Sequence, residues 1–530
     1  MKLDKNGITD KTAWEEKGYA LPAFDRETVT EKTKNTPRWI HFGAGNIFRA
    51  FHAKLAQSLL NEGTMDTGII VAEGFDTEII EKIYKPHDDL SVLVTLKGDG
   101  SVEKTVVGSV VESLYLDRKN VDDFKRLEDC FAADTLQIAT FTITEKGYSI
   151  NDAKGEVLPG IKADYEAGPE NAESYLGKVA ALMYHRFVSG KKPIALVSTD
   201  NCSHNGDKLY DAIYSFAENW VKNGKAEKGF TAYLSDKEKV SFPWSMIDKI
   251  TPRPDENVKA LLQKDGLEDA YPVITEKKTY IAPFVNAEEC EYLVIEDAFP
   301  NGRPALEKAG VLFTDRETVE KVERMKVCTC LNPLHTSLAV FGCLLGYKKI
   351  SDEMQDETLK KMVEIIGYRE GLPVVTDPLV IDPKDFIDTV INHRLPNPFM
   401  PDTPQRIATD TSQKLAIRFG ETVKNYKNAG LDVGELKLIP LVFAGWLRYL
   451  SGVDDSGNAF ELSPDPLLSE LLPLIKNGDV ERIISNEKIF GTDLYEAGLA
   501  DKVLAYYEEL NKGPGAVRAT LEKYVADQAV

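Results

Sequence analysis

The chain has 530 residues, 43% of them hydrophobic and 28% charged, a globular composition with enough length for two large domains or three small ones. Its formal net charge of −21 repels phosphate backbones and anionic lipid surfaces, so we expect neither nucleic acid nor membrane partners. The N-terminus has no apolar signal region, and no stretch approaches the roughly 18 uninterrupted apolar residues of a spanning helix. We therefore expect a soluble cytoplasmic protein.

The six cysteines and seven histidines are scattered along the chain. They form neither a disulfide framework nor the ligand spacing of a zinc site. Cys328 and Cys330 are the one close pair, and we assign them to packing because alternate residues lie about 200° apart on a helix. We expect free thiols in a reducing compartment and a reaction that needs no metal.

The first strong pattern is an apolar run, Trp39–Phe42, that breaks into a glycine turn and continues as a helix to Leu60. A second strand is predicted over Gly68–Ala72. Further strand-like runs are separated by helical patterns, which is typical of a parallel sheet with crossover helices. These runs are Leu136–Thr144, Pro193–Ser198, Tyr271–Ile274 and Tyr292–Ile295.

Beyond about residue 313 the pattern becomes helical. Long amphipathic segments predominate at Thr358–Gly367, Ser412–Lys427 and Leu436–Leu450. The sequence therefore predicts an α/β fold: a Rossmann-type, doubly wound, mainly parallel sheet domain over residues 1–312, and a mostly helical domain that binds substrate and carries catalysis over residues 313–530.

The glycine turn after Phe42 predicts a nucleotide site. Gly43 permits the tight turn, and Gly45 lets the backbone approach a pyrophosphate at the N-terminus of the following helix. Phe48 stands where a third glycine is usual, so a plain strand-to-helix turn is the alternative. The predicted cofactor-binding residues of this turn are Gly43, Ala44, Gly45, Asn46, Ile47, Phe48 and Arg49.

An acidic residue at the tip of the second strand is where the adenosine ribose would be held. Glu73 occupies that position, and it favours NAD over its 2′-phosphorylated relative. Asp76 is close enough to compete for the role. The alternative for both is a solvated loop carboxylate.

Hydride transfer to or from a secondary alcohol needs a group that exchanges the hydroxyl proton and donors that hold the developing alkoxide. A lysine can exchange this proton when burial or neighbouring cations tune it. Lys326 lies in M-K-V-C-T-C-L-N-P-L-H-T, with Asn332 and His335 close behind it. This segment offers one base and two hydrogen-bonding partners.

Several ordered segments together resemble the long-chain polyol dehydrogenases of the mannitol dehydrogenase family, which includes fructuronate (mannonate) and tagaturonate (altronate) oxidoreductases. The resemblance runs through most of the chain and includes the lysine segment. The other matching segments are F-G-A-G-N-I-F-R-A from Phe42, T-E-K-G-Y from Thr144, V-S-T-D-N from Val197, H-N-G from His204, F-P-W-S-M-I-D-K-I-T-P from Phe242, E-D-A-F-P-N-G-R-P from Glu296 and H-R-L-P-N-P from His393.

The resemblance implies a role for each matching position. Lys326 would be the general acid/base, while Asn201 and Asn332 would donate to the substrate oxygen and His335 would hold a neighbouring hydroxyl. Glu323 would relay the proton to solvent, although a Glu three residues before a Lys is also an ordinary surface pair on a helix. The remaining assignments are Asp248 and Arg394 to the remoter part of the substrate, and Thr144 and Glu145 to the cofactor.

The lysine segment departs from the family pattern in one respect. The family has lysine and asparagine five residues apart, whereas Lys326 and Asn332 are six apart. On one unbroken helix, at about 100° per residue, Lys326 and His335 would point to opposite faces. Pro333 suggests that the helix breaks: we expect a bulge between Lys326 and Pro333 that absorbs the extra residue, with Asn332 as an N-cap.

A sugar-acid substrate would present a carboxylate that favours a cationic partner, such as Arg394 with His393 or Lys414 as helpers. The turn and the L-H-T after Asn332 resemble those of the uronate reductases more than those of mannitol 2-dehydrogenases. The resemblance therefore favours fructuronate reduction (mannonate oxidation) with NAD(H), ahead of tagaturonate reduction and then mannitol 2-dehydrogenation. A catalytically inactive protein that binds nicotinamide and a sugar acid is the alternative from another class. The resemblance implies a small-molecule sugar acid or polyol as partner, and a monomer or weak homo-oligomer.

Overall fold

The structure is a computed structural model that describes residues 1–526. It divides into two compact units: unit 1 comprises Met1–Leu96 and Val102–Glu320, and unit 2 comprises Lys97–Ser101 and the chain from Lys321 onward. The division falls within helix α10 (Arg316–Met325), whereas the sequence-based boundary at residue 312 falls at strand β15.

Unit 1 is built on a six-stranded sheet with the order β6-β3-β2-β7-β8-β9, in which every neighbouring pair is parallel. In chain order this is 3-2-1-4-5-6, the Rossmann arrangement, and the order reverses between β2 and β7. The predicted doubly wound sheet is confirmed. The strands are β2 (Trp39–Phe42), β3 (Ile69–Glu73), β6 (Val110–Tyr115), β7 (Ile138–Phe141), β8 (Ile194–Ser198) and β9 (Val240–Ser241).

Apolar side chains cover both faces of this sheet, because successive residues of a strand point to opposite sides. Ile40 and Phe42 belong to one buried cluster with residues of α4, α6 and α7, and Trp39 belongs to another with residues of α3. The helices of unit 1 are α1 (Lys11–Glu15), α2 (Arg26–Asn35), α3 (Ala53–Asn61), α4 (Val121–Ala132), α5 (Pro159–Ala167), α6 (Tyr175–Val188), α7 (Asn205–Lys222), α8 (Gly229–Ser235) and α9 (Glu256–Asp265).

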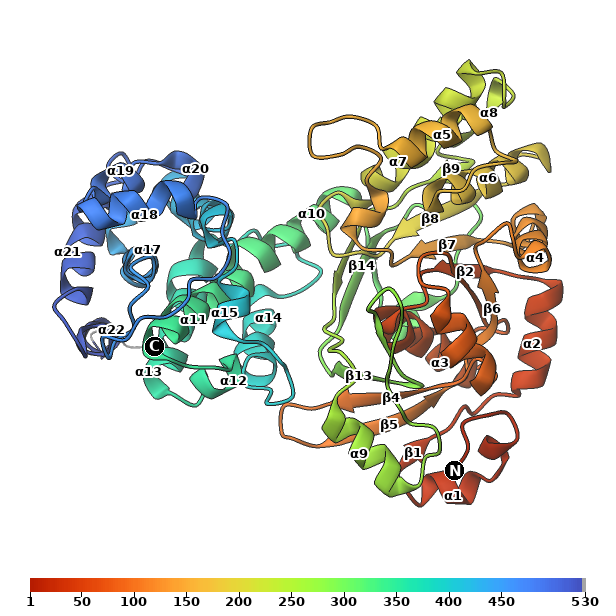
Figure 1. Cartoon of the computed structure of the whole chain (residues 1–530), viewed down its shortest axis with the longest axis horizontal. Helices are drawn as coiled ribbons and strands as arrows, with labels where there is room; N and C mark the ends of the chain where they lie inside the picture. The colour runs from red at the N-terminus through yellow and green to blue at the C-terminus, as the bar shows by residue number, and fades with distance from the viewer. Residues whose placement is uncertain (527–530) are drawn as a thin grey trace. The chain divides into compact units, whose positions relative to one another are not determined.

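Smaller sheets complete unit 1. Strands β4 and β5 form an antiparallel hairpin. Strand β13 pairs in parallel with β4, and β1 pairs in parallel with β5 (Figure 1). This sheet was not predicted from the sequence, since β13 pairs Phe284 with Val92 from a distant part of the chain. The strands are β1 (Tyr19–Ala20), β4 (Ser91–Leu96), β5 (Val102–Val107) and β13 (Phe284–Glu288), then β10 (Ser245–Asp248) with β14 (Tyr292–Glu296) and β15 (Leu312–Thr314), and β11 (Val273–Ile274) with β12 (Tyr280–Ile281).

Unit 2 is helical, as predicted. Helix α17 is buried along its whole length, and α11 packs against it. The helices are α11 (Asn332–Leu345), α12 (Ile350–Glu353), α13 (Glu357–Glu364), α14 (Pro383–Thr389), α15 (Pro404–Ile407), α16 (Glu421–Asn428), α17 (Leu438–Tyr449), α18 (Leu468–Asn477), α19 (Val480–Ile484), α20 (Glu487–Phe490), α21 (Ala500–Leu510) and α22 (Ala516–Ala526).

Within the described residues, one helical run, Arg316–Leu345, is long and apolar enough to cross a membrane by length and composition. It consists of α10, a π-helical turn and α11. Of its most apolar window, 83% is buried inside the protein, as in a core helix. The run matters because it carries the lysine segment.

Candidate active site

The glycine turn lies directly after β2, at the point where the strand order reverses. Gly43 has φ +105°, and a Cβ there would lie 2.2 Å from the carbonyl oxygen of Thr142, so no other residue fits. A Cβ at Gly45 would meet nothing within 4 Å. The helix that starts at Asn46 directs its N-terminus toward this open space, which fits the pyrophosphate of a dinucleotide.

The side chains that follow the turn are used inside the protein. Phe48, in place of a third glycine, is fully buried and stacks on the His41 ring at 4.1 Å. Arg49 is also buried, and it donates to the carbonyl oxygen of Ala282 at 2.7 Å and to Oδ1 of Asn46 at 2.9 Å. Both side chains are therefore engaged in contacts within the protein. Contact between either residue and a cofactor stays a prediction.

Glu73 ties the turn after β2 to the turn after β3. One carboxylate oxygen accepts the N–H of Ala44 at 2.8 Å, and the other accepts the N–H groups of Gly74, Phe75 and Asp76. Burial raises the pKa of the Glu73 carboxyl, and these four hydrogen bonds oppose the rise. The carboxylate is thus an internal clamp of the nucleotide site, and ribose binding by Glu73 stays a prediction.

A second clamp lies at the carboxyl ends of β7 and β8, and the sequence analysis did not single it out. Asp200 accepts the backbone N–H groups of Ile143 at 2.8 Å and Thr144 at 2.9 Å, and the hydroxyl of Tyr148 at 2.6 Å. It holds Thr144 at φ +65°, a conformation that non-glycine residues rarely adopt. Burial raises the pKa of Asp200.

The predicted site residues of unit 1 lie around this second clamp and at the end of β10. Thr144, Glu145 and Asn201 are exposed. Glu145 forms an ion pair with Lys208. Asp248 is the last residue of β10 and is buried. The signal for Asp200 was its position beside Asn201 in V-S-T-D-N, where a strand end puts both at the ligand-binding edge of the sheet.

The lysine segment of unit 2 is not a regular α-helix. Lys326 begins a π-helical turn, η7 (Lys326–Cys330), and its carbonyl oxygen accepts the N–H of Leu331 at 3.1 Å. Leu331 leaves helical geometry, with φ −130° and ψ −62°, and α11 then starts at Asn332. The predicted bulge between Lys326 and Pro333 is confirmed, and it absorbs the extra residue of this chain.

The prediction that Asn332 is an N-cap is wrong. The N-cap is Leu331, because the π-turn closes on that residue and α11 restarts one position later. Asn332 is the first residue of the helix, and no side chain caps it. The half-buried amide of Asn332 is therefore not committed to capping, which leaves it suited to a ligand.

The other predicted residues of unit 2 surround this segment. Lys326 is buried, with 4% of its surface exposed. Glu323, on α10, is half-buried, and Arg394 is buried at the end of a π-helical turn, Val390–Arg394. Nε2 of His335 lies 3.4 Å from Oδ2 of Asp402 and makes no hydrogen bond within residues 1–526.

The environment of His335 keeps its imidazole neutral. Burial lowers the pKa of His335 to about 4, and the positive charges of Arg418, Arg394 and Arg406 oppose protonation further, against the attraction of Asp402. At physiological pH this histidine is therefore a hydrogen-bonding group, with one donor and one acceptor nitrogen.

Both units match domain models of one family. Residues 37–308 match the mannitol dehydrogenase Rossmann domain, and residues 318–511 match the mannitol dehydrogenase C-terminal domain. The D-mannonate oxidoreductase of Thermotoga maritima is 54% identical over 538 aligned positions that cover 99% of each chain. A mannitol 2-dehydrogenase of Pyrenophora tritici-repentis is 30% identical over 95% of this chain and 84% of its own.

The fold also matches a solved structure along its whole length. The ternary complex of Pseudomonas fluorescens mannitol 2-dehydrogenase with NAD and D-mannitol is 28% identical, covers 100% of both chains, and has a TM-score of 0.69. The glycine turn and the lysine segment described above lie in the Rossmann and C-terminal matches respectively.

Proposed function

Since the chain belongs to the mannitol dehydrogenase family, with both of its domains matched, we propose that it is a D-mannonate oxidoreductase that interconverts D-mannonate and D-fructuronate. It is an NAD-dependent oxidoreductase. The observation that carries the choice of substrate is the 54% identity to the Thermotoga maritima D-mannonate oxidoreductase along the full chain, against 30% for the mannitol 2-dehydrogenase.

The proposed reaction divides between the two units. Unit 1 binds the dinucleotide, with its pyrophosphate at Gly45 and the start of the following helix. When bound, NADH would supply the hydride for the carbonyl carbon of the substrate. Unit 2 supplies the proton: Lys326 gives a proton to the carbonyl oxygen, and the products are a secondary alcohol and NAD⁺.

The remaining residues hold the substrate and return the proton. Asn201 and Asn332 donate hydrogen bonds to the reacting oxygen and so stabilise its developing charge. Neutral His335 binds a neighbouring hydroxyl, and Glu323 passes a proton between Lys326 and solvent. Asp248 and Arg394 hold the remoter part of the sugar. The uncommitted amide of Asn332 and the neutral imidazole of His335 support these roles.

The test is a side-by-side assay of NADH oxidation with fructuronate, tagaturonate and fructose under identical conditions. We expect the highest kcat/KM with fructuronate. A higher value with tagaturonate or fructose would assign the enzyme to altronate oxidation or mannitol oxidation instead. Tight NADH binding without turnover of any of the three would replace the proposal by a sugar-acid-binding protein.

We further propose that the enzyme acts in the cytoplasm as a monomer or weak homo-oligomer, with small molecules as its only partners. The net charge of −21 supports the part of this proposal that concerns partners, since it disfavours binding to nucleic acid and to anionic lipid. Light scattering at micromolar concentration tests the oligomeric state, and a stable tetramer would contradict it.

A further inference from the structure

Unit 2 contains a group of cationic side chains around His335. Its members come from α15, from the π-helical turn at Arg394 and from a second π-helical turn, η12 (Ala416–Gly420). His335 lies 3.4 Å from Asp402, which pairs with Arg406, and Arg418 bonds to Thr336 beside His335. The positive charges of Arg418, Arg394 and Arg406 oppose protonation of His335. Neither Arg418 nor Arg406 was predicted from the sequence.

Arg418 lies against the end of α11 that carries the predicted site residues. Its Nη1 donates to the hydroxyl of Thr336, the residue directly after His335. The Thr336 hydroxyl in turn donates to the carbonyl oxygen of Asn332 at 2.8 Å. Arg418 is thus connected through one side chain to the turn of helix that presents Asn332 and His335.

The side chain of Arg418 is half-buried, and no carboxylate of the described chain compensates its charge. No carboxylate within residues 1–526 pairs with it, and its hydrogen bond to Thr336 is its only one to the protein. Burial alone lowers the pKa of Arg418 to about 10. A cation removed from water in this way is costly unless an anion joins it.

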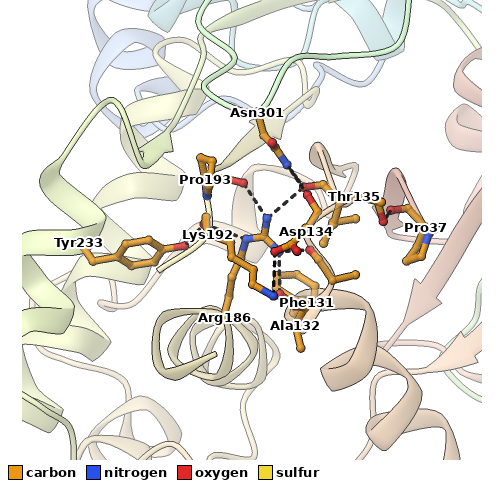
Figure 2. Close-up of polar contacts among 12 residues, drawn as sticks. Pro37, Phe131, Ala132, Asp134, Thr135, Arg186, Lys192, Pro193, Tyr233 and Asn301 are labelled. Carbon is orange, nitrogen blue, oxygen red and sulfur yellow. Dashed lines mark hydrogen bonds and ion pairs between the residues drawn. The ribbon is translucent and has the colours of Figure 1, made fainter. Parts of the chain in front are cut away.

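Elsewhere in the chain, an arginine with only a structural role is buried in a different way. Arg186, on α6 of unit 1, is fully buried, and all five of its N–H donors reach backbone carbonyls (Figure 2). Two of these carbonyls belong to Phe131 and Leu136. The half-buried guanidinium of Arg418 has no such set of acceptors within residues 1–526, and its donors other than the one to Thr336 remain for a ligand.

The neighbouring cations do not take the place of an anion. Arg406 forms an ion pair with Asp402, and its side chain is 61% exposed. Lys414, one helical turn before Arg418, is half-buried and donates to the carbonyl oxygen of Thr409. Its positive charge and that of Arg418 repel each other, and this lowers the pKa of Lys414 after burial, which is the larger cause. Since no carboxylate within residues 1–526 pairs with Arg418 itself, its guanidinium remains available to an anionic ligand.

We infer that Arg418 binds the carboxylate of a sugar-acid substrate and is the residue that selects a sugar acid over the corresponding polyol. The inference rests on the proposed function, because it places one group of that substrate. A carboxylate accepts two parallel hydrogen bonds from a guanidinium and also neutralises its charge. The terminal hydroxyl of a polyol can accept a hydrogen bond but brings no charge.

The decisive experiment compares two ligands that differ only in this group. D-Mannonate and D-mannitol are titrated into the NAD-loaded enzyme by calorimetry, with the wild type, Arg418→Met, Arg418→Lys and the control Arg406→Met. For the wild type we expect mannonate to bind about 30-fold tighter or more, which is the usual size of a charge-assisted, bidentate interaction. Arg418→Met should bring the two affinities within about 3-fold of each other, while Arg406→Met keeps the wild-type ratio.

Arg418→Lys keeps the charge and loses the bidentate geometry, so we expect an intermediate ratio of the mannonate and mannitol affinities. This variant also provides the test if Arg418→Met does not fold. In the assay with fructuronate, Arg418→Met should raise KM about 30-fold and change kcat little, because the carboxylate is remote from the reacting carbon. Retention of the mannonate preference in Arg418→Met, or no preference in the wild type, overturns the inference. Failure of the wild type to reduce fructuronate overturns the proposed function instead, since the binding comparison does not depend on turnover.

Discussion

The backbone N–H of Leu331 donates to the carbonyl oxygen of Lys326, a bond that spans five residues where a regular α-helix spans four. This one bond takes up the extra residue in the lysine segment. Around the helix axis, Lys326 and His335 are then equivalent to residues eight positions apart, an angle of about 80°. In a regular α-helix they would be nine positions apart, an angle of about 180°. A phase difference of about 80° is compatible with a common substrate, whereas one of about 180° is not.

Lys326→Ala should abolish turnover and leave cofactor binding intact. We expect kcat/KM to fall about 1000-fold or more at low and high pH alike, because the proton has lost its donor and acceptor. The Kd for NADH, measured by fluorescence, should stay within about 2-fold. The matched control is Arg324→Ala, which removes a nearby exposed cation that pairs with Glu421. Near-native turnover in Lys326→Ala would reject this lysine as the acid/base.

Two glycine substitutions should separate folding of the turn from binding of the cofactor. Gly43→Ala places a methyl group 2.2 Å from the carbonyl oxygen of Thr142 at a positive φ, so we expect a loss of about 2 kcal/mol or more in the free energy of unfolding, together with weak NADH binding. Gly45→Ala meets no protein atom within 4 Å. It should fold normally and still bind NADH about 10-fold more weakly, because the methyl group occupies the approach of the pyrophosphate. Unchanged NADH affinity in Gly45→Ala would move the pyrophosphate elsewhere.

Asp200→Asn should loosen the loop that carries Thr144. An asparagine offers one acceptor oxygen where the carboxylate serves two N–H groups and the Tyr148 hydroxyl, and its amide donor would face another donor. Because buried hydrogen-bonding groups would lose their partners, we expect the free energy of unfolding to fall by about 1–3 kcal/mol and kcat/KM to fall by about 10- to 100-fold. Asp152→Asn, which alters an exposed carboxylate that also accepts backbone N–H groups, is the control. Wild-type kcat/KM in Asp200→Asn would show that the loop is held by other contacts.

Glu353 makes the stability of the enzyme depend on pH. This residue of α12 is fully buried, neither carboxyl oxygen has a hydrogen-bond partner within residues 1–526, and burial raises its pKa well above the ordinary value. The folded protein therefore holds a proton that the unfolded chain releases above its ordinary pKa. The stability contributed by this group is complete below that pKa and is lost as pH rises toward the folded value.

The neutral variant Glu353→Gln should remove this dependence. Its Tm relative to the wild type should increase between pH 5 and pH 8, with a gain of about 1–2 kcal/mol in unfolding free energy at the higher pH. Asp352→Asn, at the exposed neighbouring position, should give the same difference at both pH values. A Tm difference for Glu353→Gln that does not change with pH would show that the pKa of Glu353 is not raised in the folded protein.

Local patterns predicted the parts of the molecule that local forces determine. The run from Trp39 into the glycine turn is a strand and a turn in the structure, because strand periodicity and two glycines suffice to specify them. Pro333 and the six-residue spacing predicted the bulge at Lys326. The same reasoning misplaced the N-cap, since a π-turn that ends at Leu331 leaves no mark in the residue pattern.

Features that depend on contacts distant in sequence could not be predicted in this way. The pairing of β13 with β4 depends on the final packing of the chain, and so does the burial of Arg418 against Thr336. Asp200 stood in a quoted motif, but only the loop that folds back over it shows that its carboxylate is an acceptor for backbone groups.

Glu73 also sets a limit on redesign of the coenzyme preference. The usual substitution for accepting a phosphorylated ribose exchanges the acidic residue at this strand end for a small or basic one. Here the exchange would leave four main-chain amides without their acceptor, one of them in the turn itself. A variant that accepts NADPH therefore needs a replacement oxygen at this position as well as a new positive charge, and single substitutions should lose affinity for both coenzymes.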